Sequence, residues 1–163
     1  MIREVLQKGN EILATKAEKI EDKAEIARII QDMRDTITHL KTTYDFTRGI
    51  GLAAPQIGEL SRITVIESGG KEYVLVNPEF AKLSEEKADV WEGCLSFFEY
   101  RANVSRHTAV TVRAQDEHGE EYEIEAKGDF AASLQHEIDH LDGILYSDRL
   151  PNGDKDLVVS DKA

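Results

Sequence analysis

The sequence predicts an α+β fold, in which one long N-terminal helix and mainly antiparallel β-sheets pack around a central helix that carries an H-E-x-x-H motif. Three observations predict it. Apolar residues recur at three- and four-residue steps in residues 23–42, β-branched and aromatic runs dominate residues 62–127, and a helical period returns in residues 129–141. The length of 163 residues, with no linker or internal repeat, indicates a single domain, residues 1–163.

The first helix is expected from about Lys23 to about Thr42. Asp22 and Glu25 form a capping-box pattern at its start, where the helix dipole also favours acidic residues. One apolar stripe runs along it, made of Ile26, Ile29, Ile30, Met33, Ile37 and Leu40. This pattern is typical of a packing helix.

The strands are expected in two hairpins. Residues 63–66 and 73–76 flank a Ser-Gly-Gly turn, and residues 110–114 and 122–126 flank a second turn. Pro78 is expected to end the second strand, because proline cannot donate to a ladder. Glutamates alternate with apolar residues in the run of residues 122–126, which predicts that one face of this strand is acidic and solvated.

Composition limits the function classes. The chain has 32 acidic and 20 basic residues, a net charge of −12, which argues against direct binding of nucleic acid over a wide surface. No apolar run approaches the roughly 18 residues of a membrane span, and the N-terminus lacks the apolar segment of a signal peptide. A cytoplasmic monomer with no membrane contact is therefore the expectation.

Residues 135–143 carry the motif with the clearest chemistry. In a helix, the four-residue spacing puts His136 and His140 on one face, so both imidazoles reach a single metal ion. Glu137 then lies beside a water at that ion. Asp129 is expected to cap the helix at its start and Gly143 at its end. The motif supplies only two ligands, so a third must come from elsewhere.

The candidates for the third ligand are Cys94 and the carboxylates. A single cysteine excludes an internal disulfide, and this one lies in a stretch with glycine and serine neighbours that can present a thiolate. A lone cysteine is more often inert in a core, and H-E-x-x-H arises by chance in many helices. The residues alone leave both alternatives open.

Residues 48–58 contain three glycines and one proline, which predicts a loop. A phosphate-binding turn is disfavoured, because the third glycine of a dinucleotide fingerprint and the G-K-[ST] of a P-loop are missing. Small residues also allow a bound chain to approach the backbone closely.

Three segments together resemble the motifs of peptide deformylases in order and spacing: residues 49–56 (GIGLAAPQ), 92–96 (EGCLS) and 135–140 (QHEIDH). The resemblance covers nearly the whole chain. It implies one catalytic domain that hydrolyses the formyl group from the N-terminal formyl-methionine of newly synthesised polypeptides and releases formate. It also implies one divalent metal ion, Fe²⁺ in the cell, with Zn²⁺, Ni²⁺ or Co²⁺ also accommodated.

The resemblance assigns roles residue by residue. Cys94, His136 and His140 are implied as metal ligands, and Glu137 as the general base. The side-chain amide of Gln56 and the backbone N–H of Leu95 are implied as donors to the negatively charged formyl oxygen. The substrate is implied to pair as an extended strand and to place methionine in an apolar pocket. The residues implied for substrate binding are Ile50, Gly51, Gly93, Val90, Arg101, Ala132 and Ser133, with His136 also at the pocket.

This chain departs from the family's pattern at Phe97-Phe98 and at Ser105, where the family commonly has proline, and the loss of two prolines is expected to loosen this segment. The ligands and Glu137 are unaffected. Two alternatives stand beside the deformylase interpretation: a metallopeptidase that cleaves internal bonds, and a deformylase-like protein that binds metal without catalysis. Expected partners are N-formylmethionyl nascent peptides and, transiently, the ribosome.

Overall fold

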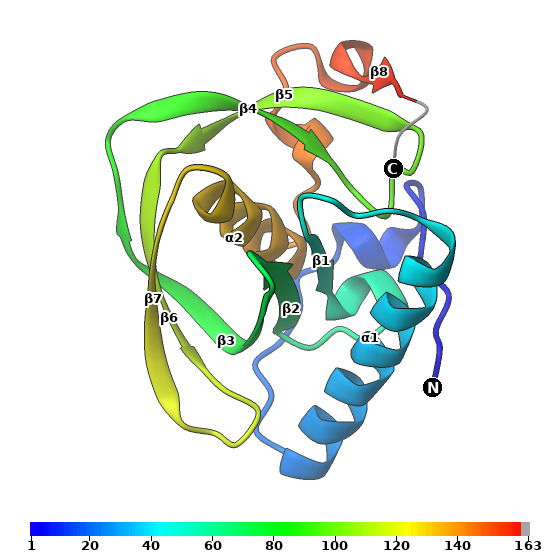
Figure 1. The fold of residues 1–163 in the computed structure, drawn as a ribbon, viewed down its shortest axis with the longest axis vertical. Coiled ribbons are helices and arrows are strands. Elements are labelled where there is room, and N and C mark those ends of the chain that lie inside the picture. Colours follow the sequence, from blue (N-terminus) through cyan, green and yellow to red (C-terminus); the bar gives the residue numbers. More distant parts are fainter. Residues whose placement is uncertain (161–163) are drawn as a thin grey trace.

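The computed structural model describes residues 1–160, which form two antiparallel sheets and two α-helices (Figure 1). The larger sheet has the strand order β1-β2-β3-β6-β7 and the smaller one β4-β5-β8. The predicted α+β class is confirmed. The helices are α1 (Lys23–Thr43) and α2 (Gly128–Leu141), and the strands are β1 (Ile50–Ala53), β2 (Ile63–Ser68), β3 (Lys71–Leu83), β4 (Lys87–Gly93), β5 (Tyr100–His107), β6 (Ala109–Gln115), β7 (Glu121–Lys127) and β8 (Val158–Val159).

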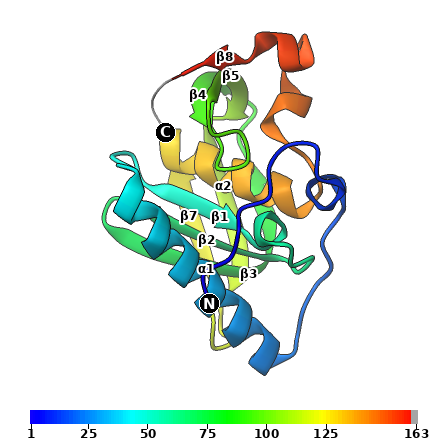
Figure 2. The same ribbon diagram turned by 90° about the vertical axis from the view of Figure 1, so that its right-hand side faces the viewer.

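The larger sheet separates the two helices. Val65 of β2 belongs to the apolar cluster that contains α1, whereas its neighbour Ile66 belongs to the cluster that contains Leu134 and Ile138 of α2. Successive strand residues point to opposite faces, so α1 and α2 cover opposite faces of one sheet. In two perpendicular views α1 lies against β1 and β2 on one side, and α2 lies between this sheet and the β4–β5 hairpin (Figures 1 and 2).

Both expected hairpins are present, as the β2–β3 and β6–β7 pairs. The prediction that Pro78 ends its strand was wrong, because β3 continues through it to Leu83. The register against β6 shifts between Val76 and Glu79, and Asn77 has a φ of 51°. A bulge of this kind accommodates a residue that cannot donate to the ladder. The Asn77 side chain bonds the backbone N–H and C=O of Ile20, which holds the bulge in place.

The ends of α2 differ in detail from the expectation. The helix begins at Gly128 with Lys127 as its N-cap, so Asp129 lies in the first turn and is not the cap. Gly143 has a φ of 72°, and a Cβ there would lie 2.8 Å from the backbone of Ala14. Only glycine fits both this conformation and this close approach. Within residues 1–160, no helix is long and apolar enough to cross a membrane.

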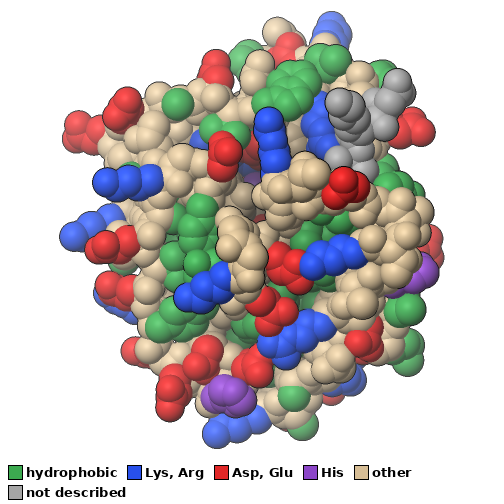
Figure 3. All heavy atoms as spheres, viewed as in Figure 1, with side chains coloured by type: hydrophobic (Ala, Val, Ile, Leu, Met, Phe, Trp, Pro, Cys, Tyr) green, Lys and Arg blue, Asp and Glu red, His purple; other side chains and the backbone are tan. Residues whose placement is uncertain are grey.

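Acidic and basic side chains are interspersed on the surface seen in Figure 3, without one large basic area on that face. Three glutamates of β7 are exposed, while Ile124 and Ala126, which alternate with them, are buried, as the alternation predicted. The three are Glu121, Glu123 and Glu125. These acids belong to a solvated sheet face.

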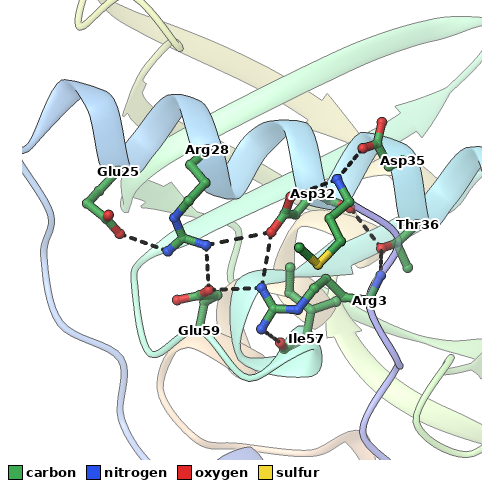
Figure 4. Close-up of polar contacts among 9 residues, drawn as sticks. Arg3, Glu25, Arg28, Asp32, Asp35, Thr36, Ile57 and Glu59 are labelled. Carbon is green, nitrogen blue, oxygen red and sulfur yellow. Dashed lines mark hydrogen bonds and ion pairs between the residues drawn. The ribbon is translucent and has the colours of Figure 1, made fainter.

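A polar cluster ties the N-terminal segment to α1 and to the short helix of residues 54–57 (Figure 4). The Arg3 guanidinium donates to Asp32 of α1 at 3.1 Å, to Glu59 at 3.1 Å and to the carbonyl of Ile57 at 3.0 Å. Arg28 of α1 donates to the same Glu59 at 3.0 Å. The cluster therefore fixes the segment that carries Gln56 relative to α1.

Candidate active site

Three predicted ligands from two parts of the chain meet at one point. The donor atoms of Cys94, His136 and His140 all lie within 4.8 Å of one another. Cys94 follows β4, and its Sγ lies 3.3 Å from Nε2 of His140 on α2. The two imidazole rings have centroids 5.0 Å apart, one helical turn from each other.

These residues fit a divalent metal ion. A thiolate with two imidazoles is a donor set for Zn²⁺ or Fe²⁺, and three protein ligands leave a position open for catalysis. Nδ1 of His136 lies 2.8 Å from Oε1 of Glu92, which leaves its Nε2 for the metal. Burial lowers the pKa of His140 well below its ordinary value, so its ring is neutral and keeps a lone pair.

The charge around His136 also suits a cation. Burial alone would lower the pKa of His136, but the negative charges of Cys94 and Glu92 raise it well above its ordinary value. A site that attracts a proton through these two groups attracts a divalent cation by the same Coulomb force, and the cation then replaces the proton on the imidazole.

Glu137 has the environment of a general base. Its carboxyl group is buried, and its Oε2 has no hydrogen-bond partner among residues 1–160. Burial raises the pKa of Glu137 to about 7, against the attraction of a charged His136. A carboxylate with this pKa both accepts and returns a proton near neutral pH. Gly51 makes room for it, since a Cβ there would lie 2.8 Å from the Glu137 carboxyl carbon.

A buried chain of ion pairs orients the histidine ligand. Arg106 donates to both oxygens of Glu92, at 2.7 and 2.9 Å, and to Asp139 at 2.8 Å. Arg149 donates twice to Asp139, at 2.6 and 2.7 Å. Glu92 in turn accepts from His136, so the charges of five side chains are linked.

The sequence analysis did not identify the bonds of Arg106 to Glu92 or the contribution of Arg149. A signal for Arg106 was present. Ala102, Val104 and Arg106 alternate on the buried face of β5, and a cation at such a position needs a carboxylate partner. No comparable local pattern marks Arg149.

Gln56 is held with its amide nitrogen toward the ligands. It is 1% exposed, its Oε1 accepts from the backbone N–H of Ala53 at 2.9 Å, and its Nε2 donates to Ser96 Oγ at 3.1 Å. The same Nε2 lies 3.6 Å from Cys94 Sγ. An N–H donor therefore faces the centre beside the cysteine.

Residues 6–8 join the two loops of the site. The Leu6 N–H donates to the Gln56 carbonyl at 2.8 Å, and Gln7 Nε2 donates to the Leu95 carbonyl at 2.9 Å. The Lys8 N–H donates to the Ser96 carbonyl at 3.0 Å. Sequence reasoning missed this staple, because backbone bonds between distant segments leave no residue pattern.

The predicted peptide-pairing residues lie on strands next to the ligands. Ile50 and Gly51 are on β1, the edge of the larger sheet, and Gly93 ends β4. The Arg101 guanidinium lies against Gly93, where a Cβ would be 1.2 Å from Nη1. Only glycine allows this contact.

The predicted methionine pocket is less clearly assembled. Ile50 packs in the cluster with Leu52 and Leu95, while Val90 and Ala132 belong to none of the apolar clusters formed within residues 1–160. Ser133 is half-buried on α2. The apolar clusters do not test whether these residues form one wall, and the pocket stays a prediction.

The sequence profile of the polypeptide deformylase family matches residues 2–156. The chain belongs to the peptide deformylase family. It is 42% identical over 152 residues to the peptide deformylase of Heliobacterium modesticaldum, covering 93% of this chain and 95% of that protein. It is 41% identical to the peptide deformylase of Dictyoglomus thermophilum, with 91% and 93% covered.

Solved structures agree. A peptide deformylase from Legionella pneumophila superposes with a TM-score of 0.84 at 37% identity, covering 94% of this chain and 89% of that one. The enzyme from Synechococcus elongatus in complex with actinonin gives 0.83 at 32% identity, with 92% and 79% covered. Peptide deformylases are hydrolases that remove the N-formyl group from nascent polypeptides, and this chain is a hydrolase of that class.

Proposed function

We propose that residues 1–163 form one catalytic domain that removes the formyl group from N-terminal formyl-methionine, with one divalent metal ion held by Cys94, His136 and His140. The observation that carries this proposal is the meeting of these three donors beside the buried carboxylate of Glu137, whose Oε2 has no hydrogen-bond partner among residues 1–160. We propose Fe²⁺ in the cell, with Zn²⁺, Ni²⁺ or Co²⁺ also accommodated. When bound, such an ion polarises the formyl carbonyl and lowers the pKa of a water.

The protein's own groups move the proton. Glu137 accepts a proton from the water whose oxygen bonds to the formyl carbon. The carbon–nitrogen bond then breaks, Glu137 returns the proton to the leaving amine, and formate departs. Its pKa of about 7 suits both transfers. Gln56 and the N–H of Leu95 donate to the formyl oxygen while it carries negative charge, and the fixed orientation of the Gln56 amide supports this role.

The substrate peptide adds as a strand between the edge of β1 and the end of β4. It pairs with the backbone of Ile50, Gly51 and Gly93, and Arg101 holds its main chain. The methionine side chain packs in a pocket whose wall includes Val90, Ala132 and Ser133. Pairing through the backbone suits an enzyme that processes many different nascent chains.

Because its proposed substrates are nascent polypeptides, the enzyme is expected to act close to the translation machinery. We propose a cytoplasmic monomer that meets the ribosome transiently. The interspersed surface charges and the net charge of −12 support a contact of short duration over a small area.

Formate release from formyl-Met-Ala-Ser tests the activity, with protein purified without oxygen and its metal content measured. The wild type is expected to release formate with one equivalent of metal bound, and Glu137→Gln to lose activity by about 100-fold or more while it keeps the metal. Cleavage of an internally placed bond in a blocked peptide, without formate release, would favour a metallopeptidase. Metal binding without either product would favour a non-catalytic protein.

A further inference from the structure

The direction in which a substrate leaves the site follows from the position of β1. β1 is the edge strand of its sheet, with β2 on one side and no strand of residues 1–160 on the other. The Glu137 carboxylate lies against Gly51, and the buried Gln56 closes the C-terminal end of the strand. A peptide whose formyl end lies beside Glu137 therefore runs along β1 toward its N-terminal end, where Arg48 precedes the strand.

A pocket of about 300 Å³ lies at that end. The end of α1, the loop before β1 and the β2–β3 turn form its walls, with Lys41, Phe46, Arg48 and Glu67 among the lining residues. The lining includes Ile50 and the loop residues just before it, so a peptide that runs toward the N-terminal end of β1 meets this loop a few residues after its methionine.

The charged side chains that line this pocket do not balance one another. Lys41 forms an ion pair with Glu67, so these two charges cancel. The exposed Arg48 makes no hydrogen bond or ion pair with any other residue of the described part of the chain. Arg48 therefore keeps an uncompensated positive charge at the end of β1 toward which the substrate runs.

We propose that Arg48 is a specificity-determining residue, which favours substrates with aspartate or glutamate at the third or fourth position, counting formyl-methionine as the first. This inference rests on the proposed function. In antiparallel pairing a methionine opposite Gly51 puts the second residue opposite Ile50, the first residue of β1, so the third and fourth residues lie beside the loop that contains Arg48. The guanidinium then donates to the substrate carboxylate.

The contact between Arg48 and the substrate is expected to change substrate binding and not the chemical step. Arg48 is remote from the bond that breaks, so its contact is equally strong before and during the reaction and changes KM, with kcat unchanged. The contact is exposed to solvent, which limits the preference to about two- to five-fold and makes it weaken in high salt.

Formate release from four-residue formyl-Met-Ala peptides tests the inference, with Asp, Asn or Lys placed at position three or four. The expected order of kcat/KM is Asp over Asn over Lys at one of the two positions, with KM carrying the difference. Arg48→Gln is expected to equalise the peptides and Arg48→Glu to reverse the order. Arg113→Gln, which removes an exposed arginine on β6, three strands away from β1, is the matched control and keeps the wild-type order.

Equal kcat/KM for all peptides at both positions in the wild type would overturn the inference and leave the deformylase activity intact. A preference that survives Arg48→Gln would also overturn it. Formate release from none of the peptides would instead contradict the proposed function, and the inference would fall with it. Thermal unfolding of each variant checks that the fold is retained.

Discussion

The Glu137 carboxylate occupies the space that a side chain at position 51 would need. A Cβ on Gly51 would lie 2.8 Å from its carboxyl carbon, and a Cβ on Gly93 would lie 1.2 Å from the Arg101 guanidinium. At both positions glycine admits a functional side chain of another segment to the backbone. In the proposed pairing of the substrate with β1, the same glycine would bring the base and the peptide backbone together.

Gly51→Ala is expected to lower kcat by about 100-fold, because a methyl group displaces the Glu137 carboxylate by about 1 Å or more. Formate release under saturating substrate measures it. Gly119→Ala, which adds a methyl group into open space at the β6–β7 turn, is the control; because Gly119 has a φ of 86°, this variant is expected to lose some stability but to keep kcat. A Gly51→Ala variant with wild-type kcat would show that this contact does not position the base.

At the scale of elements, the N-terminal segment is part of the scaffold that holds α1 against the site. Asp32 is 6% exposed and accepts from Arg3 and from the N-terminal ammonium of Met1, which also pairs with Asp35. Burial alone would raise the pKa of Asp32, but the two cations outweigh it and lower the pKa below its ordinary value of 3.8.

The lowered pKa of Asp32 determines how the stability of the fold depends on pH. Because the pKa of Asp32 is lower in the folded protein, its ion pairs contribute stability fully above pH 3.8 and lose it as the pH falls toward the folded value. Arg3→Leu is therefore expected to lower the free energy of unfolding by about 1–3 kcal/mol at pH 7 and by less at pH 3. Urea unfolding at both pH values measures it. Arg113→Leu, at an exposed pair, should change little at either pH, and an equal loss from Arg3→Leu at both would contradict the assignment.

Local patterns predicted the elements whose side chains alternate or recur. The apolar stripe of residues 23–42 and the β-rich runs correspond to α1 and to the paired strands. The strand was predicted to end at Pro78, but a β-bulge allows it to continue. Hydrogen bonds between Asn77 and Ile20, which are distant from each other in sequence, stabilise this bulge. The aromatic packing around residues 97–98 also could not be predicted from the sequence motif. The Phe97 ring packs edge-to-face against Tyr146, with centroids 4.8 Å apart, and Phe98 packs at a tilt against Tyr44, with centroids 4.6 Å apart. Aromatic contacts therefore hold the segment that lacks the family's proline.

At the scale of the whole molecule, the metal site joins parts that are far apart in sequence. Cys94 belongs to the β4–β5 region and the two histidines to α2. The sequence motifs indicated these three residues, since ligand identity is local chemistry. The supports were not readable, because Arg149 and the backbone bonds of residues 6–8 depend on tertiary structure alone.

Removal of the metal is expected to destabilise the fold. An ion present at 100 times its dissociation constant stabilises the native state by about 2.7 kcal/mol, which corresponds to a loss of roughly 5–10 °C in Tm on chelation for a domain of this size. Calorimetry with and without a chelator, followed by metal addition, measures it. Cys94→Ser should shrink this shift, whereas an unchanged Tm on chelation of the wild type would contradict a metal bridge between β4 and α2.

The staple of residues 6–8 has a consequence for turnover. It binds the carbonyl of Gln56 on one side of the catalytic centre and the carbonyls of Leu95 and Ser96 on the other. Moving these two walls apart would break three hydrogen bonds at a cost of about 0.5–1.5 kcal/mol each. These bonds oppose a separation of the Gln56 segment from the Leu95–Ser96 segment. In the proposed binding mode a substrate would therefore enter and leave along the open edge of β1, and the two segments would not have to move apart in each catalytic cycle.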